Sequence, residues 1–205
     1  MISLIQTAEG ALNETHAILQ RMRELAVQGA NDTNVEDDRT AIQDELNQLA
    51  SEIDRIAKTT EFNTQPLLSA SGGFSATLQI GANKDQTIAI QISNMNTSSL
   101  SLGAATIAVS THAFAGVAIS AIDNAIKLVS KQRSKLGAYQ NRLDHTINNL
   151  STSSENLTAA ESRVRDVDMA KELMQQTKNS ILSQASQAML AQANQMPQGV
   201  LQLLR

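Results

Sequence analysis

Histidine is the residue type in this sequence best suited to acid–base or metal chemistry, but the spacing of the histidines supports neither. His16, His112 and His145 lie far apart, and none has a Cys or a second His four residues further on, as a metal-binding helix would need. His145 follows Asp144 in a stretch with helical periodicity, where a surface histidine is more common than a general base. Gly-rich phosphate loops and nucleophile elbows are also absent. We therefore expect no enzyme activity, no metal and no cofactor.

Two clusters of charge each allow a functional and a simpler interpretation. The basic cluster consists of Lys127, Lys131, Arg133 and Lys135. It is more often a solvated helix face than a nucleic-acid contact, and the net charge of -4 argues against nucleic acid. The acidic cluster consists of Glu36, Asp37 and Asp38. Its simpler role is to stabilise the positive end of a helix that Asn34 or Thr33 caps, and the alternative is a metal site.

The composition favours long helices over a globular enzyme. The 205 residues include no Cys, no Trp, one Tyr and three Phe, so the core must consist of Leu, Ile, Val, Ala and Met. Such side chains suit narrow helix–helix seams better than a roomy pocket. No run of 18 purely apolar residues occurs, so we expect no membrane insertion. The first residues also lack a basic region followed by an apolar segment, the pattern of a signal peptide.

Apolar residues repeat at alternating three- and four-residue steps in three stretches, which predicts three long helices. The longest spans about 114–165, with Arg133 and Gln140 among the polar residues in its stripe. The second spans about 2–28, and the third continues to about Thr59 after a polar turn, so these two form an antiparallel hairpin. The stripe residues are Ile5, Ala8, Leu12, Thr15, Leu19, Met22 and Ala26, then Ile42, Leu46, Leu49, Ile53 and Ile56, then Ile119, Ile122, Ile126, Val129, Leu136, Leu143, Ile147, Leu150, Leu157 and Val164.

Between the helices, alternating apolar residues before and after Gly81 predict a β-hairpin with one buried face. Residues 93–111 show no periodicity. After Asp168 the charge disappears, and no ionisable side chain lies between Lys178 and Arg205. This predicts an uncharged amphipathic helix that copies of the chain or a partner would cover, since its many amides do not suit lipid.

A polar face on the first helix is a candidate binding surface. Gln20, Arg21, Glu24 and Gln28 surround Leu25, which we expect to be exposed. Ile42, Glu45 and Gln48 form a matching face on the antiparallel helix. The simpler interpretation is surface ion pairs of little energetic weight. The alternative is a binding hot spot, formed by an arginine and an apolar residue on a rigid support.

Several stretches together resemble bacterial flagellin, most closely the short type of Bacillus-like bacteria. They are SLIQTAEGAL (3–12), QRMRELAVQ (20–28), IQDE (42–45), SEIDRI (51–56), EFN (61–63), RLDHTINNL (142–150), ENLTAAESR (155–163), RDVDMA (165–170) and MLAQANQ (189–195). The resemblance covers most of the chain outside about 64–116. It implies a structural subunit of the flagellar filament, acting in motility, secreted through the flagellar type III apparatus and located outside the cell. A hook–filament junction protein, which shares the terminal helices, is the alternative.

The resemblance implies a mainly α fold, an elongated antiparallel rod with a small β-hairpin. Residues 1–63 would be the N-terminal helix hairpin, 64–112 the variable segment, 113–167 the long helix and 168–205 the terminal inner-tube helix. Family members begin with a further stretch that pairs with the terminal helix. We therefore expect that this chain is truncated, that the partner of its terminal helix is missing, and that its assembly with other subunits is impaired.

The resemblance also implies partners and site residues. A flagellar export chaperone would bind the tail, which also packs the inner tube, through Ile181, Leu182, Ala185, Met189, Leu190, Val200, Leu201, Leu203 and Leu204. The flagellin-sensing Toll-like receptor of animals would contact Gln20, Arg21, Arg23, Glu24, Leu25, Gln28, Ile42, Glu45 and Gln48. The terminal leucines Leu201, Leu203 and Leu204 resemble those that a cytosolic innate sensor reads.

Overall fold

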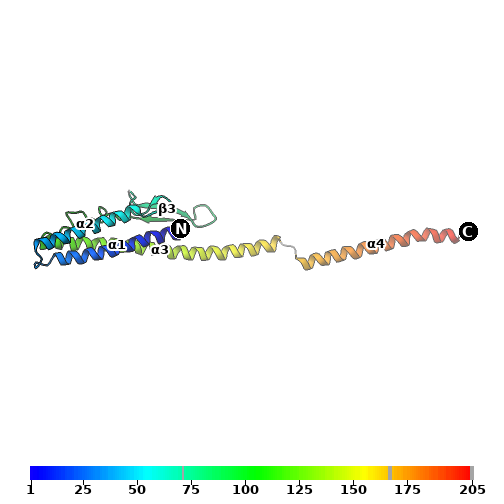
Figure 1. Ribbon diagram of the computed structural model, residues 1–205. Helices are drawn as coiled ribbons and strands as arrows, with labels where there is room; N and C mark the ends of the chain where they lie inside the picture. The colour runs from blue at the N-terminus through cyan, green and yellow to red at the C-terminus, as the bar shows by residue number, and fades with distance from the viewer. Residues whose placement is uncertain (71, 166–167, 204–205) are drawn as a thin grey trace. The chain divides into compact units, whose positions relative to one another are not determined.

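The chain divides into two units, Met1–Leu150 and Ser151–Arg205. The computed structural model describes residues 1–70, 72–165 and 168–203, with side chains up to Asn194 except at the gaps. The mainly α class with one small β-hairpin is confirmed, since four helices and two short antiparallel strand pairs make up the described structure (Figure 1).

Helices α1 (Ile2–Gly29) and α2 (Glu36–Thr59) form the expected antiparallel hairpin. All seven predicted stripe residues of α1 are buried, and Leu12, Leu19 and Met22 are fully so. A fully buried side chain of this size contributes about 1.5–3 kcal/mol. On α2 the predicted Ile42, Leu46 and Ile53 are buried. Repeating apolar positions thus define the faces along which the two helices meet.

The start of α2 differs from the prediction. Its N-cap is Val35 rather than Asn34 or Thr33, and the Asp38 carboxylate accepts a hydrogen bond from the Val35 N–H at 3.4 Å. The Asn34 amide is occupied elsewhere, because its Nδ2 donates to the Gln28 carbonyl at 2.6 Å. The acidic cluster does lie in the first turn of α2, where negative charge stabilises a helix.

Side chains from α2 and from α3 (His112–Arg165) cap the end of α1. The Arg39 guanidinium donates to the Gly29 carbonyl at 3.0 Å and to the Asn31 carbonyl at 3.2 Å. His112 Nδ1 lies 2.7 Å from the Ala30 oxygen. Carbonyls at a helix C-terminus have no partner within the helix, so these contacts satisfy them. Arg39 is only 9% exposed, a burial that these hydrogen bonds make tolerable.

The predicted β-hairpin consists of β3 (Phe74–Gln79) and β4 (Thr87–Ile92), paired antiparallel. Alternate residues Ile88, Ile90 and Ile92 are buried, as the pattern predicted. Gly73, just before β3, has φ +88°, and a Cβ there would lie 2.7 Å from the Ile92 oxygen. A second pair, β1 (Glu61–Phe62) with β2 (Gln65–Pro66), was not predicted because two-residue strands leave no periodicity.

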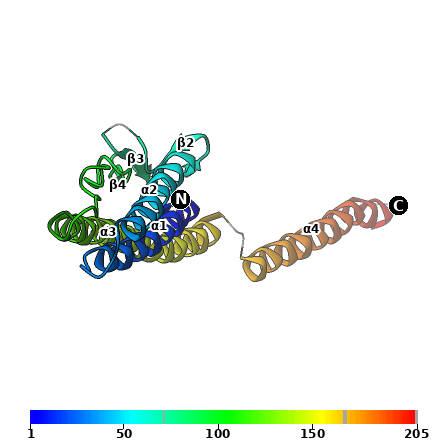
Figure 2. The ribbon, with the colours of Figure 1, turned by 60° about the vertical axis from the view of Figure 1, so that its left-hand side comes forward.

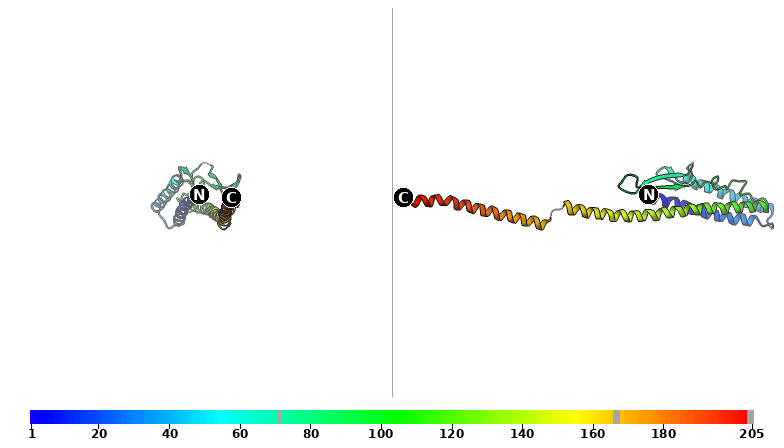
Figure 3. Two further views of the ribbon diagram at one scale, coloured as in Figure 1. Left: turned by 90° about the vertical axis from the view of Figure 1, so that its right-hand side faces the viewer. Right: turned by 180° about the vertical axis from the view of Figure 1, so that it is seen from behind.

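In the first unit, the long helix α3 buries a seam from Ala115 to Leu143, and the predicted stripe residues Ile119 and Ile126 are half-buried beside it. The polar residue in this seam is Gln132 rather than Arg133; its Nε2 donates to the Gln91 carbonyl at 3.2 Å, which joins α3 to β4. The views in Figures 2 and 3 place α2 and α3 on either side of α1, with the hairpin of β3 and β4 above them.

The rest of the predicted stripe on α3 is exposed. Ile147 and Leu150 are 51% and 41% exposed, and Leu157 and Val164 are 70% and 90% exposed. Periodicity therefore predicted the helix correctly but not its burial, because burial also requires a second surface.

Residues 93–111, which show no periodicity, are held by side chains of α2. The Asp54 carboxylate accepts hydrogen bonds from the Thr97 N–H at 2.8 Å and from the Thr97 hydroxyl at 2.9 Å. Further along, Gln43 Oε1 accepts from the Val109 N–H at 2.9 Å. The backbone of this segment thus finds partners on a helix rather than in a regular sheet, which explains the absence of a pattern.

Helix α4 (Met169–Leu203) forms most of the second unit. The stretch 112–194, which contains α3 and most of α4, includes one 18-residue window with a mean hydropathy of 1.4, and 28% of that window is buried. Length and composition alone would let such a helix cross a membrane, so the absence of a purely apolar run does not by itself exclude a crossing. This is weak evidence for a membrane, because core helices of soluble proteins pass the same test.

Candidate functional site

The predicted polar surface exists, and we call it the α1–α2 face. Its exposed members are Gln20, Arg21, Glu24, Gln28, Glu45 and Gln48. The Arg21 guanidinium lies at its centre and donates from Nε and Nη2 to Glu45 Oε1, at 3.0 and 2.9 Å. A weaker contact of 3.4 Å joins Arg21 Nη1 to Glu24 Oε2 one turn along α1.

These charges are accessible although they are paired. The side chains of Arg21, Glu45 and Glu24 are 52%, 45% and 70% exposed. Hydrogen bonding to Glu45, and then the charge of that carboxylate, raise the pKa of Arg21 above its ordinary value, so the guanidinium stays charged. An arginine held by two hydrogen bonds loses little further freedom when a partner binds, which favours recognition.

Three predicted members of the surface lie elsewhere. Leu25, expected to be exposed, is only 2% exposed, and Ile42, which the α2 stripe predicted to be buried, is 6% exposed; both belong to the core rather than to the surface. The three- and four-residue spacing did not predict the burial of Leu25, because Leu25 lies beside the α1 stripe on a flank that α2 covers. Arg23 donates from Nε to Asp123 Oδ1 of α3 at 2.7 Å, so it faces the side of α1 away from Glu45. Leu25 and Ile42 therefore support the α1–α2 face from beneath.

The histidines do not come together as a catalytic or metal site. His112 lies against the end of α1, and the described residues contain no group of three His, Cys, Asp or Glu side chains placed to hold a metal ion. His145 lines an open hollow with Asp85 and Asn149, between the β-hairpin loop and α3. No third titratable side chain joins them among the residues that line it.

The other candidate surface is the apolar face of α4. Every described side chain of this helix is exposed, including Ile181 at 60%, Leu182 at 54%, Met189 at 69% and Leu190 at 63%. Ala185 is exposed as well. Val200, Leu201 and Leu203 lie in the backbone of α4, but their side chains are outside the described residues, as is Leu204 altogether.

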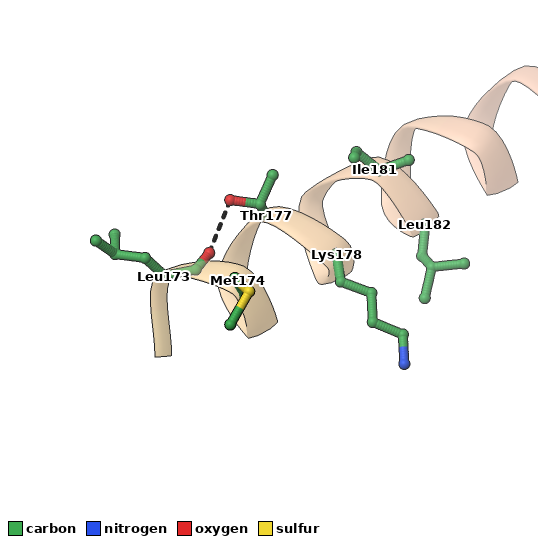
Figure 4. Close-up of a pocket in the computed structure, with 6 residues that line it drawn as sticks. All are labelled: Leu173, Met174, Thr177, Lys178, Ile181 and Leu182. Carbon is green, nitrogen blue, oxygen red and sulfur yellow. Dashed lines mark hydrogen bonds between the residues drawn. The ribbon is translucent and has the colours of Figure 1, made fainter. Parts of the chain in front are cut away.

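Sequence reasoning missed part of this face. Leu173, Met174 and Lys178 line a shallow groove together with Ile181 and Leu182 (Figure 4). Spacings of three, four, seven and eight residues place them on neighbouring positions of one helix, which was the signal available in the sequence. Lys178 contributes one positive charge and Thr177 one hydroxyl group to this groove, whose other lining side chains are apolar.

The mainly helical fold and its two exposed candidate surfaces are typical of structural proteins that assemble through helix packing. Comparison with known proteins agrees. Residues 1–72 match the family model for the bacterial flagellin N-terminal helical region, and residues 119–204 match that for the C-terminal helical region. The chain belongs to the bacterial flagellin family, whose members are the subunits of the flagellar filament.

Flagellins of other bacteria match this sequence over its whole length. The flagellin of Halalkalibacterium halodurans is 59% identical over 204 residues, covering 100% of this chain and 75% of the relative. The flagellin of Bacillus subtilis is 52% identical, covering 100% and 77%. The resemblance to a short, Bacillus-like flagellin is thus confirmed.

Solved structures support the same fold. The crystal structure of Bacillus cereus flagellin has a TM-score of 0.64 at 33% identity, covering 78% of this chain and 90% of that one. A hook-associated protein from Vibrio parahaemolyticus has a TM-score of 0.63 at 18% identity, which shows a shared fold alone. The alternative of a hook–filament junction protein is not favoured.

Proposed function

We propose that α4 is the segment through which this filament subunit engages other helices, first those of a flagellar export chaperone and then those of neighbouring subunits. The observation that carries the proposal is the exposure of the apolar side chains on α4, each more than half exposed. An apolar face of this extent is costly in water, so a partner helix that covers it gains the hydrophobic free energy of burial.

The charge distribution favours a helical partner over lipid. α4 contains many Gln, Ser and Asn side chains and only three ionisable ones, Lys171, Glu172 and Lys178, all within its first ten residues. Amide and hydroxyl groups would be left without partners in hydrocarbon, whereas they hydrogen-bond readily along the edges of a helix–helix seam. Export through the flagellar type III apparatus to the cell exterior completes this proposal.

The test is a calorimetric titration of the full chain with the flagellin export chaperone. Ile181→Asp combined with Met189→Asp places two charges on the apolar face. Gln176→Asp combined with Ser183→Asp places the same two charges on the opposite face and is the matched control. We expect the first variant to lose binding and the control to retain it; equal binding by both would contradict the proposal.

A second proposed function rests on the α1–α2 face. The Arg21–Glu45 pair is rigidly held yet about half exposed, which is the combination expected of a hot spot for a protein receptor. We propose the flagellin-sensing Toll-like receptor of animals as the partner, with Arg21, Glu24, Gln20, Gln28, Glu45 and Gln48 in contact. Surface binding of the receptor ectodomain to the parent chain and to Arg21→Ala tests it. Undiminished binding of Arg21→Ala would exclude this surface.

A further inference from the structure

Methionine is the residue type in this chain that a mild oxidant modifies most readily. The sequence contains seven Met but no Cys and no Trp, so a peroxide finds no thiol or indole to react with. Met22 and Met95 lie in the core of the first unit, at 0% and 4% exposed. Met169, Met174 and Met189 of α4 are 66%, 68% and 69% exposed. Oxidation should therefore be selective for α4 over the core.

The three exposed methionines of α4 do not share one side of the helix. Met174, Lys178 and Leu182 follow one another at four-residue steps, and Met189 lies seven residues after Leu182, so both Met174 and Met189 belong to the apolar face. Figure 4 shows Met174 and Lys178 pointing to the same side of α4. Met169 lies five residues before Met174, which places it about 140° away around the helix. It is equally exposed but lies off the apolar face.

Oxidation changes the polarity of this face at one atom of each methionine. The thioether sulfur attacks one oxygen of hydrogen peroxide, an S–O bond forms as the O–O bond breaks, and the second oxygen leaves as water with both hydrogens. The sulfur loses two electrons and the peroxide gains them. The product is a polar sulfoxide, whose oxygen accepts hydrogen bonds. Lys178, one turn from Met174, forms no ion pair among the described residues and offers an N–H donor to that oxygen.

We propose that Met174 and Met189 form a reversible oxidation site that controls whether the apolar face of α4 can be covered by another helix. This inference rests on the proposed function of α4. A thioether gains free energy when a partner buries it, whereas a sulfoxide must give up its hydrogen bonds to water. Methionine sulfoxide reductases restore the thioether, so the loss of binding is reversible.

Mass mapping of peptides from the full chain tests the selectivity of oxidation. After brief exposure to hydrogen peroxide, the three exposed methionines of α4 should each gain one oxygen, while Met22 and Met95 remain unmodified. Circular dichroism should show the same helicity before and after oxidation. With the flagellin export chaperone bound, Met174 and Met189 should react more slowly and Met169 at an unchanged rate. Equal protection of Met169 would contradict the assignment of the covered face.

Calorimetry with the same chaperone tests the consequence of oxidation. Every chain carries Met196→Leu, because the side chain of Met196 lies outside the described residues, and the peroxide is removed before the chaperone is added. The oxidised reference chain should bind about tenfold more weakly or worse, a change that calorimetry resolves readily. Met174→Leu with Met189→Leu keeps a similar apolar volume, so its affinity should be the same before and after oxidation. Met169→Leu should lose affinity on oxidation as the reference chain does.

Treatment of the oxidised reference chain with methionine sulfoxide reductases should restore its affinity. An oxidised reference chain that binds as tightly as before would overturn the inference. So would an equal loss in the variant without Met174 and Met189, or a loss that the reductases do not reverse. Failure of the proposed function has a different signature, since the reference chain would then not bind the chaperone even before oxidation, and the inference would fall with it.

Discussion

The Arg21 guanidinium donates two hydrogen bonds to a single oxygen of Glu45, from Nε at 3.0 Å and from Nη2 at 2.9 Å, and so joins α1 to α2 across the surface. Arg23, two residues further on, reaches the opposite side of α1 and pairs with Asp123 of α3 at 2.7 Å. Two arginines that lie two residues apart on α1 therefore pair with different helices, Arg21 with α2 and Arg23 with α3.

This pair of arginines gives a matched test of recognition. Arg21→Ala should weaken binding to the Toll-like receptor ectodomain by tenfold or more, by the standard of hot-spot residues. Arg23→Ala should have a much smaller effect, because its side chain faces α3. Both variants should melt near the parent temperature, since exposed ion pairs add little to stability. Similar losses of binding for the two variants would contradict the assignment of the α1–α2 face.

Arg39 should matter for stability far more than the exposed arginines. Replacing it with Met removes the donors to the Gly29 and Asn31 carbonyls at the end of α1. We expect a loss of about 2–4 kcal/mol in the free energy of unfolding, as for other buried groups stripped of their partners. Urea unfolding measures it, and Arg39→Lys should recover part of the loss. A Met variant as stable as the parent would show that this cap is dispensable.

The anchor of residues 93–111 can be tested at Asp54. Asp54→Ala leaves the Thr97 N–H without its acceptor, so we expect a loss of about 1–3 kcal/mol. Hydrogen exchange at the Thr97 amide should accelerate, while amides in the middle of α1 remain protected. Asp54→Asn, which keeps one acceptor oxygen, should fall between Ala and the parent. Unchanged exchange at Thr97 in the Ala variant would argue against the anchor.

Glu52 provides a prediction about pH. The hydrogen bond from Arg55 lowers the pKa of the Glu52 carboxyl below its ordinary value, and the charge of Arg55 adds to this. The ionised form is thus favoured in the folded state, and the contact stabilises the fold above the ordinary glutamate pKa of about 4.3. This contribution disappears as the pH falls through the lowered value. Carboxyl titration by NMR should show the Glu52 midpoint rising in Arg55→Gln; an unchanged midpoint would contradict this cause.

Sequence periodicity predicted the helices because burial and spacing coincide there. All seven α1 stripe residues are buried, and α3 begins at His112 and ends at Arg165, close to the predicted bounds. The same template failed for Leu25, since α2 covers a flank next to the α1 stripe. Local spacing within α1 contains no record of where α2 packs.

Polar contacts across the fold were not predictable for a related reason. Arg39 lies in the first turns of an acidic helix, where an arginine is normally solvated, and only the fold brings the carbonyls of Gly29 and Asn31 to it. Residues 93–111 have their partners at Gln43 and Asp54, more than forty residues away. The sequence placed Arg21 and Glu45 on matching faces of a helix hairpin, and the structure adds that these two side chains pair with each other.

The most direct test of the account is the affinity of the full chain for the flagellin export chaperone when the apolar face of α4 is altered. The account predicts that Ile181→Asp with Met189→Asp abolishes measurable binding, whereas Gln176→Asp with Ser183→Asp binds like the parent chain. Equal affinities for the two variants would contradict the claim that this exposed face is the assembly surface.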